Sequence, residues 1–218
     1  MPRKKKSIAV HDKWKFKRWV LVYSPDYLGL RPLVEIPVTH DSVFRTVEIP
    51  LNDLINTTDP SARYKKVKLQ ILKEVDNKAF TEVKYYELQR DYLGSMIRRG
   101  ISKVVMIFNI TTADNLQYQV QAMTLTARRA RYRQANRIRK LMQQYITEQA
   151  QKMNHDEFVK KIITGEFAKE YKRLVFKVAP ILEDGCHVIK LKLLTPAAEL
   201  QKNFNVDVTK VRDVTPVL

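Results

Sequence analysis

Apolar residues between positions 19 and 126 recur mostly at every second position, a pattern typical of β-strands that bury one face. In residues 117–124, for example, Tyr118, Val120 and Ala122 alternate with glutamines. Strands are predicted over residues 19–23, 43–49, 66–72, 79–85, 104–111 and 117–124. Turn-forming residues separate these segments, and several short strands spaced in this way favour a small closed barrel or sandwich.

One helix is predicted within this strand-rich region, over residues 87–99. Leu88, Tyr92 and Met96 fall on one stripe at helical spacing. Gly100 is well placed to end the helix, because glycine readily adopts the left-handed conformation that follows a last helical turn.

From residue 127 onward the apolar positions follow the period of a helix. The longest stripe consists of Ile138, Leu141, Met142, Tyr145, Ile146 and Gln149. Asn154 and Glu157 resemble a capping box at the start of a second helix, which should end at Gly165. A third helix is expected to end near Pro180. We interpret these stripes as core-facing surfaces.

Together these patterns predict an α+β fold: a small β-barrel with an inserted helix, then a helical segment, with extended basic N-terminal and C-terminal tails. The predicted regions are a basic arm at 1–18, a β-barrel domain at 19–126, a helical segment with a closing strand at 127–196, and a tail at 197–218. The closing strand is predicted over residues 187–194, where Lys190 and Lys192 alternate with apolar residues.

The net charge of the chain indicates an anionic binding partner. It has 40 Lys plus Arg against 23 Asp plus Glu, which gives a formal net charge of +17. Such a charge repels itself in a compact chain unless a polyanion neutralises it. Nucleic acid is the commonest such partner, and an anionic membrane surface is the other. No apolar run approaches the ~18 residues of a membrane span, and no secretory signal is evident, so a soluble cytoplasmic protein is expected.

The strongest functional signal is a run of seven cations in thirteen residues, 128–140. They are Arg128, Arg129, Arg131, Arg133, Arg137, Arg139 and Lys140. No acid occurs between Asp114 and Glu148, so ion pairs within the helix cannot offset their repulsion. Arginine predominates here, and its planar guanidinium can donate two hydrogen bonds to one phosphate. The run therefore predicts contact with a nucleic-acid backbone rather than a solvated helix face.

A second group of cations, Arg98, Arg99 and Lys103, flanks Gly100. These residues either extend the same surface or complement the dipole at the end of the preceding helix.

A third group of cations lies in the N-terminal arm, which is expected to order only when it meets its partner. The predicted nucleic-acid contacts in this arm are Lys4, Lys5, Lys6, Lys13, Lys15, Lys17 and Arg18. Trp14, Phe16 and Trp19 lie among or just after these cations. They either anchor the arm to the core or stack on bases.

Patterns that would indicate an enzyme are missing, and we predict no catalytic residues, no metal and no cofactor. The histidines are His11, His40, His155 and His187, and their spacing does not match a metal site. His155 is expected in the first turn of a helix and needs no function there. The five glycines do not form a phosphate-cradling loop. Cys186 is the only cysteine, which excludes an internal disulfide and favours a buried, inert thiol.

Several segments spread over residues 13–194 match a known pattern. They are residues 13–19 (KWKFKRW), 47–54 (VEIPLNDL), 68–100, 111–116, 124–131, 138–142 and 156–165. In these segments the chain resembles the archaeal and eukaryotic small-subunit ribosomal protein family S3Ae, also called eS1. It departs from the family at Asn115, where the family usually has glycine, and at residues 178–185. Residues 197–218 show no match.

The resemblance implies a β-barrel core with helices, ribosomal RNA binding, and a place on the platform of the small subunit near the messenger exit. The implied partners are small-subunit ribosomal RNA and neighbouring ribosomal proteins, with messenger RNA as a further candidate neighbour. Two other classes remain as alternatives: an RNA-modification or RNA-processing accessory protein, and a membrane-surface protein. The excess of arginine over lysine in residues 128–139 weighs against the membrane alternative, as does the lack of an amphipathic lipid-facing terminus.

Overall fold

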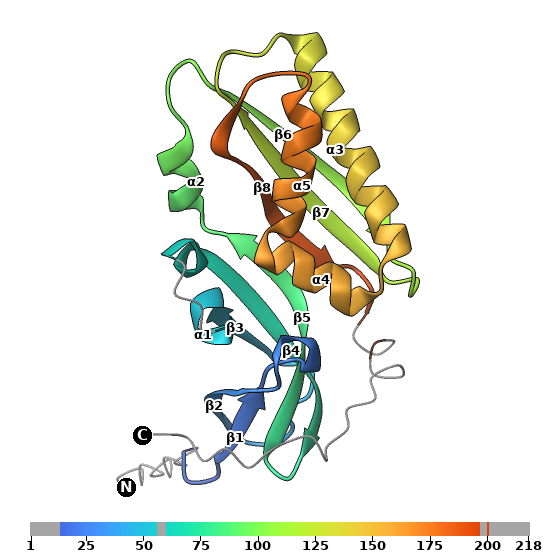
Figure 1. The fold of residues 1–218 in the computed structure, drawn as a ribbon. Helices are drawn as coiled ribbons and strands as arrows, with labels where there is room; N and C mark the ends of the chain where they lie inside the picture. Colours follow the sequence, from blue (N-terminus) through green and yellow to red (C-terminus); the bar gives the residue numbers. More distant parts are fainter. Residues whose placement is uncertain (1–13, 56–59, 197–199, 201–218) are drawn as a thin grey trace, which may run out of the picture.

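The computed structural model describes residues 14–55, 60–196 and 200 (Figure 1). Its strands are β1 (Arg18–Tyr23), β2 (Pro32–Val38), β3 (Thr46–Pro50), β4 (Lys65–Val75), β5 (Lys78–Leu88), β6 (Ser102–Thr111), β7 (Gln117–Thr126) and β8 (Ile181–Leu193). Its helices are α1 (Leu51–Ile55), α2 (Arg90–Met96), α3 (Tyr132–Lys152), α4 (His155–Thr164) and α5 (Glu166–Phe176), with short 3-10 helices η1 (Asp26–Leu28) and η2 (Pro60–Tyr64). The α+β class is therefore confirmed.

All eight strands belong to one open sheet in which β5 joins two halves. The main order is β2-β1-β5-β8-β7-β6, and β4 links β3 to β5 as a branch. The start of β5 pairs in parallel with β1, and its end pairs antiparallel with β8. Among the described residues no ladder joins β2 to β3 or to β6, so the predicted closed barrel is not confirmed. Alternation identifies strands with a buried face, but it does not determine whether the sheet closes.

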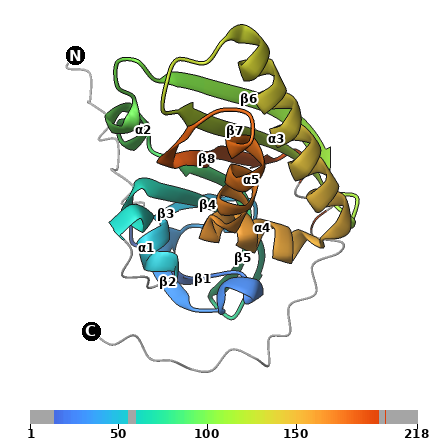
Figure 2. The ribbon, with the colours of Figure 1, turned by 45° about the horizontal axis from the view of Figure 1, so that its top comes forward.

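The helices cover the two faces of the β6–β8 part of the sheet unequally. Helices α3, α4 and α5 lie over one face (Figures 1 and 2). The short helix α2 packs Leu93 against Met123 and Leu125 of β7, which belong to a separate cluster. The largest core includes Leu69 of β4 and Ile138 of α3, so the two halves share one interior. The division of the chain at residue 126 remains a prediction.

One predicted helix start is wrong. Strand β5 continues through Leu88, which pairs with Lys65 of β4, so α2 begins at Arg90 instead of residue 87. Helix α3 begins at Tyr132, within the 128–140 run, and the first arginines of the run precede it in non-helical backbone. The sequence pattern misplaced the start of α2 because the pairing of β5 with β4 overrides local spacing there.

Strand β2 was missed because it contains Pro32 and Pro37. Among the described strands it pairs with β1 alone and is an edge strand, where the missing N–H of proline breaks no ladder. Cys186 is buried, as predicted, and burial raises the pKa of its thiol to about 11. No helix in the described part of the chain is both long and apolar enough to cross a membrane.

Candidate nucleic-acid interface

The start of β6 and the end of β7 bring two of the predicted cation groups together. Ser102 and Thr126 are partners in the β6–β7 ladder. The Ser102 hydroxyl accepts a hydrogen bond from the Ala130 N–H at 3.0 Å, and the Thr126 hydroxyl donates to the Arg128 carbonyl at 2.7 Å. These bonds hold the segment before α3 against the start of β6. The adjacency of the two groups, which the sequence left open, is therefore a consequence of strand pairing.

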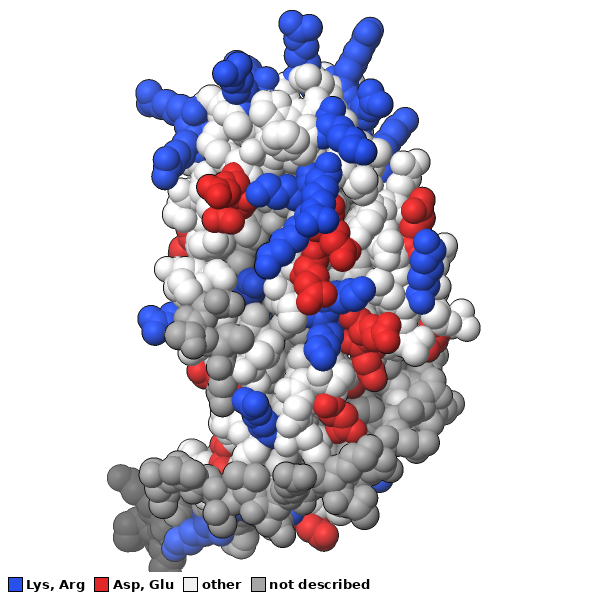
Figure 3. Space-filling view, viewed as in Figure 1, with Lys and Arg blue, Asp and Glu red and all other residues white. Residues whose placement is uncertain are grey.

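We call the resulting surface the basic end. It consists of Arg98, Arg99, Lys103, Arg128, Arg129, Arg131, Arg133, Arg137 and Lys140, all of them exposed. Within the described part of the chain, none of these side chains forms a salt bridge. Figure 3 shows Lys and Arg side chains projecting from the top of the molecule, with Asp and Glu lying lower. The basic end thus has a like-charge repulsion that only an external anion can relieve.

The start of α3 adds to the positive potential of the basic end. Its first turn contains no acid, so the partial positive charge of the helix N-terminus is not offset there. The Gln134 side chain accepts the backbone N–H of Arg131 at 3.0 Å and fixes the start of the helix. The roles of Gln134 and Ser102 were not predicted from the sequence. A polar residue three positions into a helix was the available signal for Gln134, whereas the role of Ser102 depends on strand register.

Two of the predicted contact residues use their guanidinium groups in the fold. Arg139 is half-buried and donates to the Val105 carbonyl at 3.3 Å and to the Asn136 side chain at 2.9 Å. Arg18 forms an ion pair with Glu74 at 2.6 Å. These contacts leave Arg139 and Arg18 with fewer donors for a phosphate than the arginines of the basic end.

The cations of the N-terminal arm are separated from the basic end. Lys15 and Lys17 directly precede β1 and Arg18 begins it, and the start of β1 lies at the opposite end of the molecule from the start of α3 (Figure 1). The other cations of the arm, Lys4, Lys5, Lys6 and Lys13, lie outside the described residues.

The aromatic residues of the arm do not sit in the core. Trp14 and Phe16 are each 63% exposed, and Trp19 is 57% exposed. The Lys17 ammonium lies 3.4 Å from the centre of the Trp14 ring, in a cation–π contact. This exposure favours contact with a partner over anchoring of the arm to the core.

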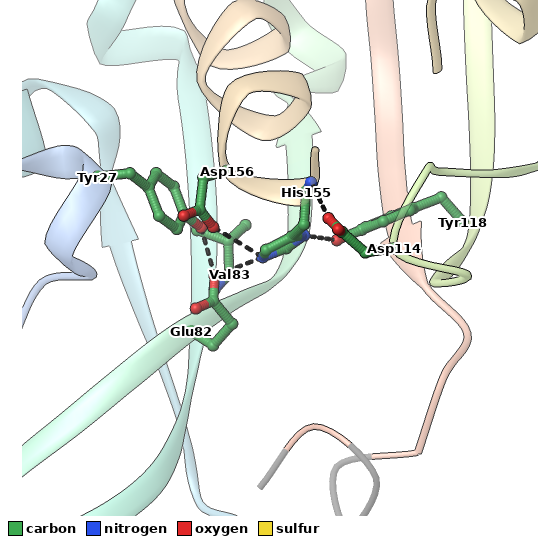
Figure 4. Close-up of polar contacts among 7 residues, drawn as sticks. All are labelled: Tyr27, Glu82, Val83, Asp114, Tyr118, His155 and Asp156. Atoms are coloured by element: carbon green, nitrogen blue, oxygen red, sulfur yellow. Dashed lines mark hydrogen bonds and ion pairs between the residues drawn. The ribbon is translucent and has the colours of Figure 1, made fainter. Parts of the chain in front are cut away.

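A buried polar network, drawn in Figure 4, connects the N-terminal half to the helical layer. His155 of α4 lies 3.0 Å from Glu82 of β5 through Nε2, and its Nδ1 meets the Tyr118 hydroxyl of β7. The Tyr27 hydroxyl of η1 donates to the same Glu82 carboxylate. Asp114, in the turn between β6 and β7, accepts the backbone N–H of His155 at 2.6 Å. Four separate segments are thus fastened to the start of α4.

This network corrects two predictions about α4. Asn154 occupies the N-cap position but makes no side-chain capping bond, so the predicted capping box does not form. The Asp114 carboxylate, close in space and distant in sequence, satisfies the N–H of His155 instead. His155 itself, which we expected to need no role, is buried at the centre of the network.

The network stabilises the protonated forms of its histidine and tyrosines. Burial lowers the pKa of His155, but the hydrogen bond and charge of Glu82, together with Asp156 and Asp114, outweigh it and raise the pKa above its usual value. Burial and the charge of Glu82 raise the pKa of Tyr27 and Tyr118, so both hydroxyls stay protonated. We therefore interpret the network as a buried ion pair that fastens the fold.

The pH dependence of stability should reveal this ion pair. Because the folded-state pKa of His155 is raised, its contribution is fully present below the unfolded value of about 6.5 and is lost as pH rises through the folded pKa. The difference in unfolding free energy between the native protein and H155Q should therefore shrink as pH rises above about 6.5 and through the raised folded-state pKa of His155. Denaturant titrations across this range measure it.

A matched control is H187Q. Burial lowers the pKa of His187, so its contribution should change with pH in the opposite direction. Parallel pH profiles for the native protein and H155Q would show that the imidazolium does not contribute.

A sequence model of the ribosomal S3Ae family matches residues 4–197, which is most of the chain and includes the basic end and the network. The chain belongs to the ribosomal S3Ae family. Proteins named small ribosomal subunit protein eS1 are among its relatives. The protein of that name from Archaeoglobus fulgidus is 33% identical over 203 residues, covering 92% of this chain and 95% of the relative. That from Desulfurococcus amylolyticus is 35% identical over 193 residues, covering 88% and 89%.

A third S3Ae relative, from Pyrobaculum arsenaticum, is 33% identical over 199 residues and covers 90% of both chains. The similarity therefore extends over nearly the full length of each protein rather than over one segment. The family assignment made from the sequence segments is confirmed.

Proposed function

We propose that this chain is a structural constituent of the small ribosomal subunit and that it holds ribosomal RNA through the basic end. Membership of the S3Ae family makes it a ribosomal protein and not an enzyme, with a role in translation in the cytoplasm. The observation that carries the RNA contact is the cluster of exposed arginines without salt bridges among the described residues. Its partners are then small-subunit ribosomal RNA and neighbouring ribosomal proteins.

The finer part of the proposal concerns position. The resemblance to the S3Ae family implies the platform of the small subunit near the messenger exit, with messenger RNA as a neighbour. The arm supplies a second RNA contact through Lys4, Lys5, Lys6, Lys13, Lys15 and Lys17. Support comes from the exposure of Trp14 and Phe16, which can stack on unpaired bases. Because Lys15 and Lys17 lie far from the basic end, the two contacts would hold the protein at both ends.

The salt dependence of RNA binding tests this function. If the basic end neutralises even about five phosphates, the slope of log K against log salt should be about −4, at roughly 0.7–0.9 per contact. Filter binding or anisotropy with a small-subunit ribosomal RNA fragment, measured over a range of KCl concentrations, gives the slope. A slope near zero would show that binding does not depend on phosphate contacts and would contradict the proposal.

A further inference from the structure

A second polar surface lies on the sheet, and strand register assembles it. Paired residues across β6, β7, β8, β5 and β4 form one row: Ile107, Gln121, Lys190, Glu87 and Lys66. A neighbouring row across β6, β7, β8, β5, β4 and β3 consists of Asn109, Gln119, Lys192, Tyr85, Lys68 and Glu48. The core-facing residues of these strands alternate with both rows, so the rows share the face opposite the largest core.

This face is hollowed into a groove of about 570 Å³, which we call the sheet-face groove. It is lined by Thr46, Lys68, Lys84, Tyr85, Glu87, Ile107, Gln119, Gln121, Lys190 and Lys192. The lining therefore contains four lysines and one acid. The volume lies within the roughly 300–1,000 Å³ typical of ligand sites.

The charges of the sheet-face groove are only partly neutralised. Lys190 pairs with Glu87 at 2.9 Å, and Lys68 pairs with Glu48 at 3.1 Å. Lys84 and Lys192 form no salt bridge within the described ranges. The groove thus keeps a positive charge that suits an anionic ligand.

The uncharged lining suits a flat ring with polar edges. Ile107 is 58% exposed, and Tyr85 presents a half-buried ring with the Lys68 and Lys190 ammonium groups 5.8 and 6.0 Å from its centre. Gln119 and Gln121 add amide groups that both donate and accept hydrogen bonds. Apolar and aromatic surfaces for stacking, amides for base edges and ammonium groups for phosphates are the components of a site for unpaired nucleotides.

We propose that the sheet-face groove binds a short single-stranded segment of RNA, a ligand class that deepens the RNA-binding role proposed above and rests on it. A duplex presents a broad, convex surface, whereas unpaired bases can enter a hollow of this size. Lys103 shares the exposed face of β6 with Ile107, because residues two and four apart on a strand face the same way. A strand held at the basic end can therefore continue along β6 into the groove. An acidic protein segment could also pair with the lysines of the groove, but its binding would not depend on the path along β6 that joins the groove to the basic end.

The test compares four forms of the full-length protein. They are the native protein, the groove variant K84Q/K192Q, the basic-end variant R129A/R131A/R133A, and the control K160Q/K177Q, which removes the same charge from exposed sites on the helical layer. The probes are a fluorescein-labelled oligouridylate of about ten nucleotides and an RNA duplex of the same length. The groove variant should bind the oligouridylate severalfold more weakly, with a salt slope flatter by up to about 1.4, at roughly 0.7 per lost contact. Its binding to the duplex should equal that of the control.

The outcomes distinguish the groove proposal from the proposed RNA binding by the basic end. Equal oligouridylate binding by the groove variant and the control would overturn the groove proposal, whatever the basic-end variant does. Loss of duplex binding in the basic-end variant tests the proposed function independently. If K84Q/K192Q instead loses binding to a labelled polyglutamate peptide while its RNA binding is unchanged, the groove is a protein site and the proposal is wrong. Ultraviolet crosslinking of the native complex should place the oligouridylate on peptides containing Tyr85.

Discussion

Replacing Arg129, Arg131 and Arg133 by alanine should weaken binding to small-subunit ribosomal RNA without destabilising the free protein. All three side chains are exposed, and none forms a salt bridge with the described residues. Removing like charges relieves repulsion. Of the three arginines only Arg133 lies within α3, and alanine is a better helix former than arginine there. The melting temperature should therefore stay the same or rise slightly. The salt slope should flatten by up to about 0.9 for each lost phosphate contact.

The matched control for this variant is K160A/K169A/R173A, which removes three exposed cations from α4 and α5. It should change RNA binding much less, because these positions lie outside the basic end. Thermal melts and RNA titrations of the two triple variants decide between a structural and an RNA-binding role. A basic-end variant that melts several degrees lower yet binds RNA normally would show that its arginines serve the fold.

Replacing Ile138 by alanine should have the largest effect on stability, about 2–5 kcal/mol of unfolding free energy. Ile138 is fully buried on the inner face of α3 and belongs to the largest core. The loss combines the transfer free energy of the removed atoms with the cavity that they leave. Urea titrations of the free protein measure it, and the folded fraction should still bind RNA with the native salt slope.

Leu141 provides the control on the same helix. The sequence placed Leu141 on the buried stripe with Ile138, but its side chain is only partly buried. L141A should therefore cost clearly less than I138A. Equal costs at the two positions would show that exposure in the structure does not describe the packing of α3.

The sequence predicted the elements well where a long periodic pattern decides them. The stripe of α3 is an example: Ile138, Met142 and Ile146 are all buried. The pattern failed where a tertiary contact determines the outcome. Strand β5 extends to Leu88 because β4 pairs with it, and the start of α4 is capped by Asp114 instead of by Asn154. Such contacts join residues far apart in the chain and leave no local signal.

The candidate interface shows the same division. The arginine run of residues 128–140 was evident from composition alone, because no acid interrupts it. Its adjacency to Arg98 and Arg99 required the pairing of Ser102 with Thr126. The lysines of β4 and β8 alternate with apolar residues on two strands that lie far apart in the sequence. Only the register places Lys68 and Lys192 on either side of Tyr85 in one groove.

The most direct test of the proposed function is the position of the protein in a sucrose gradient. Cells expressing either the tagged native chain or the tagged variant R129A/R131A/R133A would be lysed, and each lysate would be sedimented at low salt. We expect the native chain to migrate with small ribosomal subunits, and the variant to shift toward the top of the gradient as salt is raised. A native chain found only in the top fractions, apart from small subunits at low salt, would contradict a structural role in the ribosome.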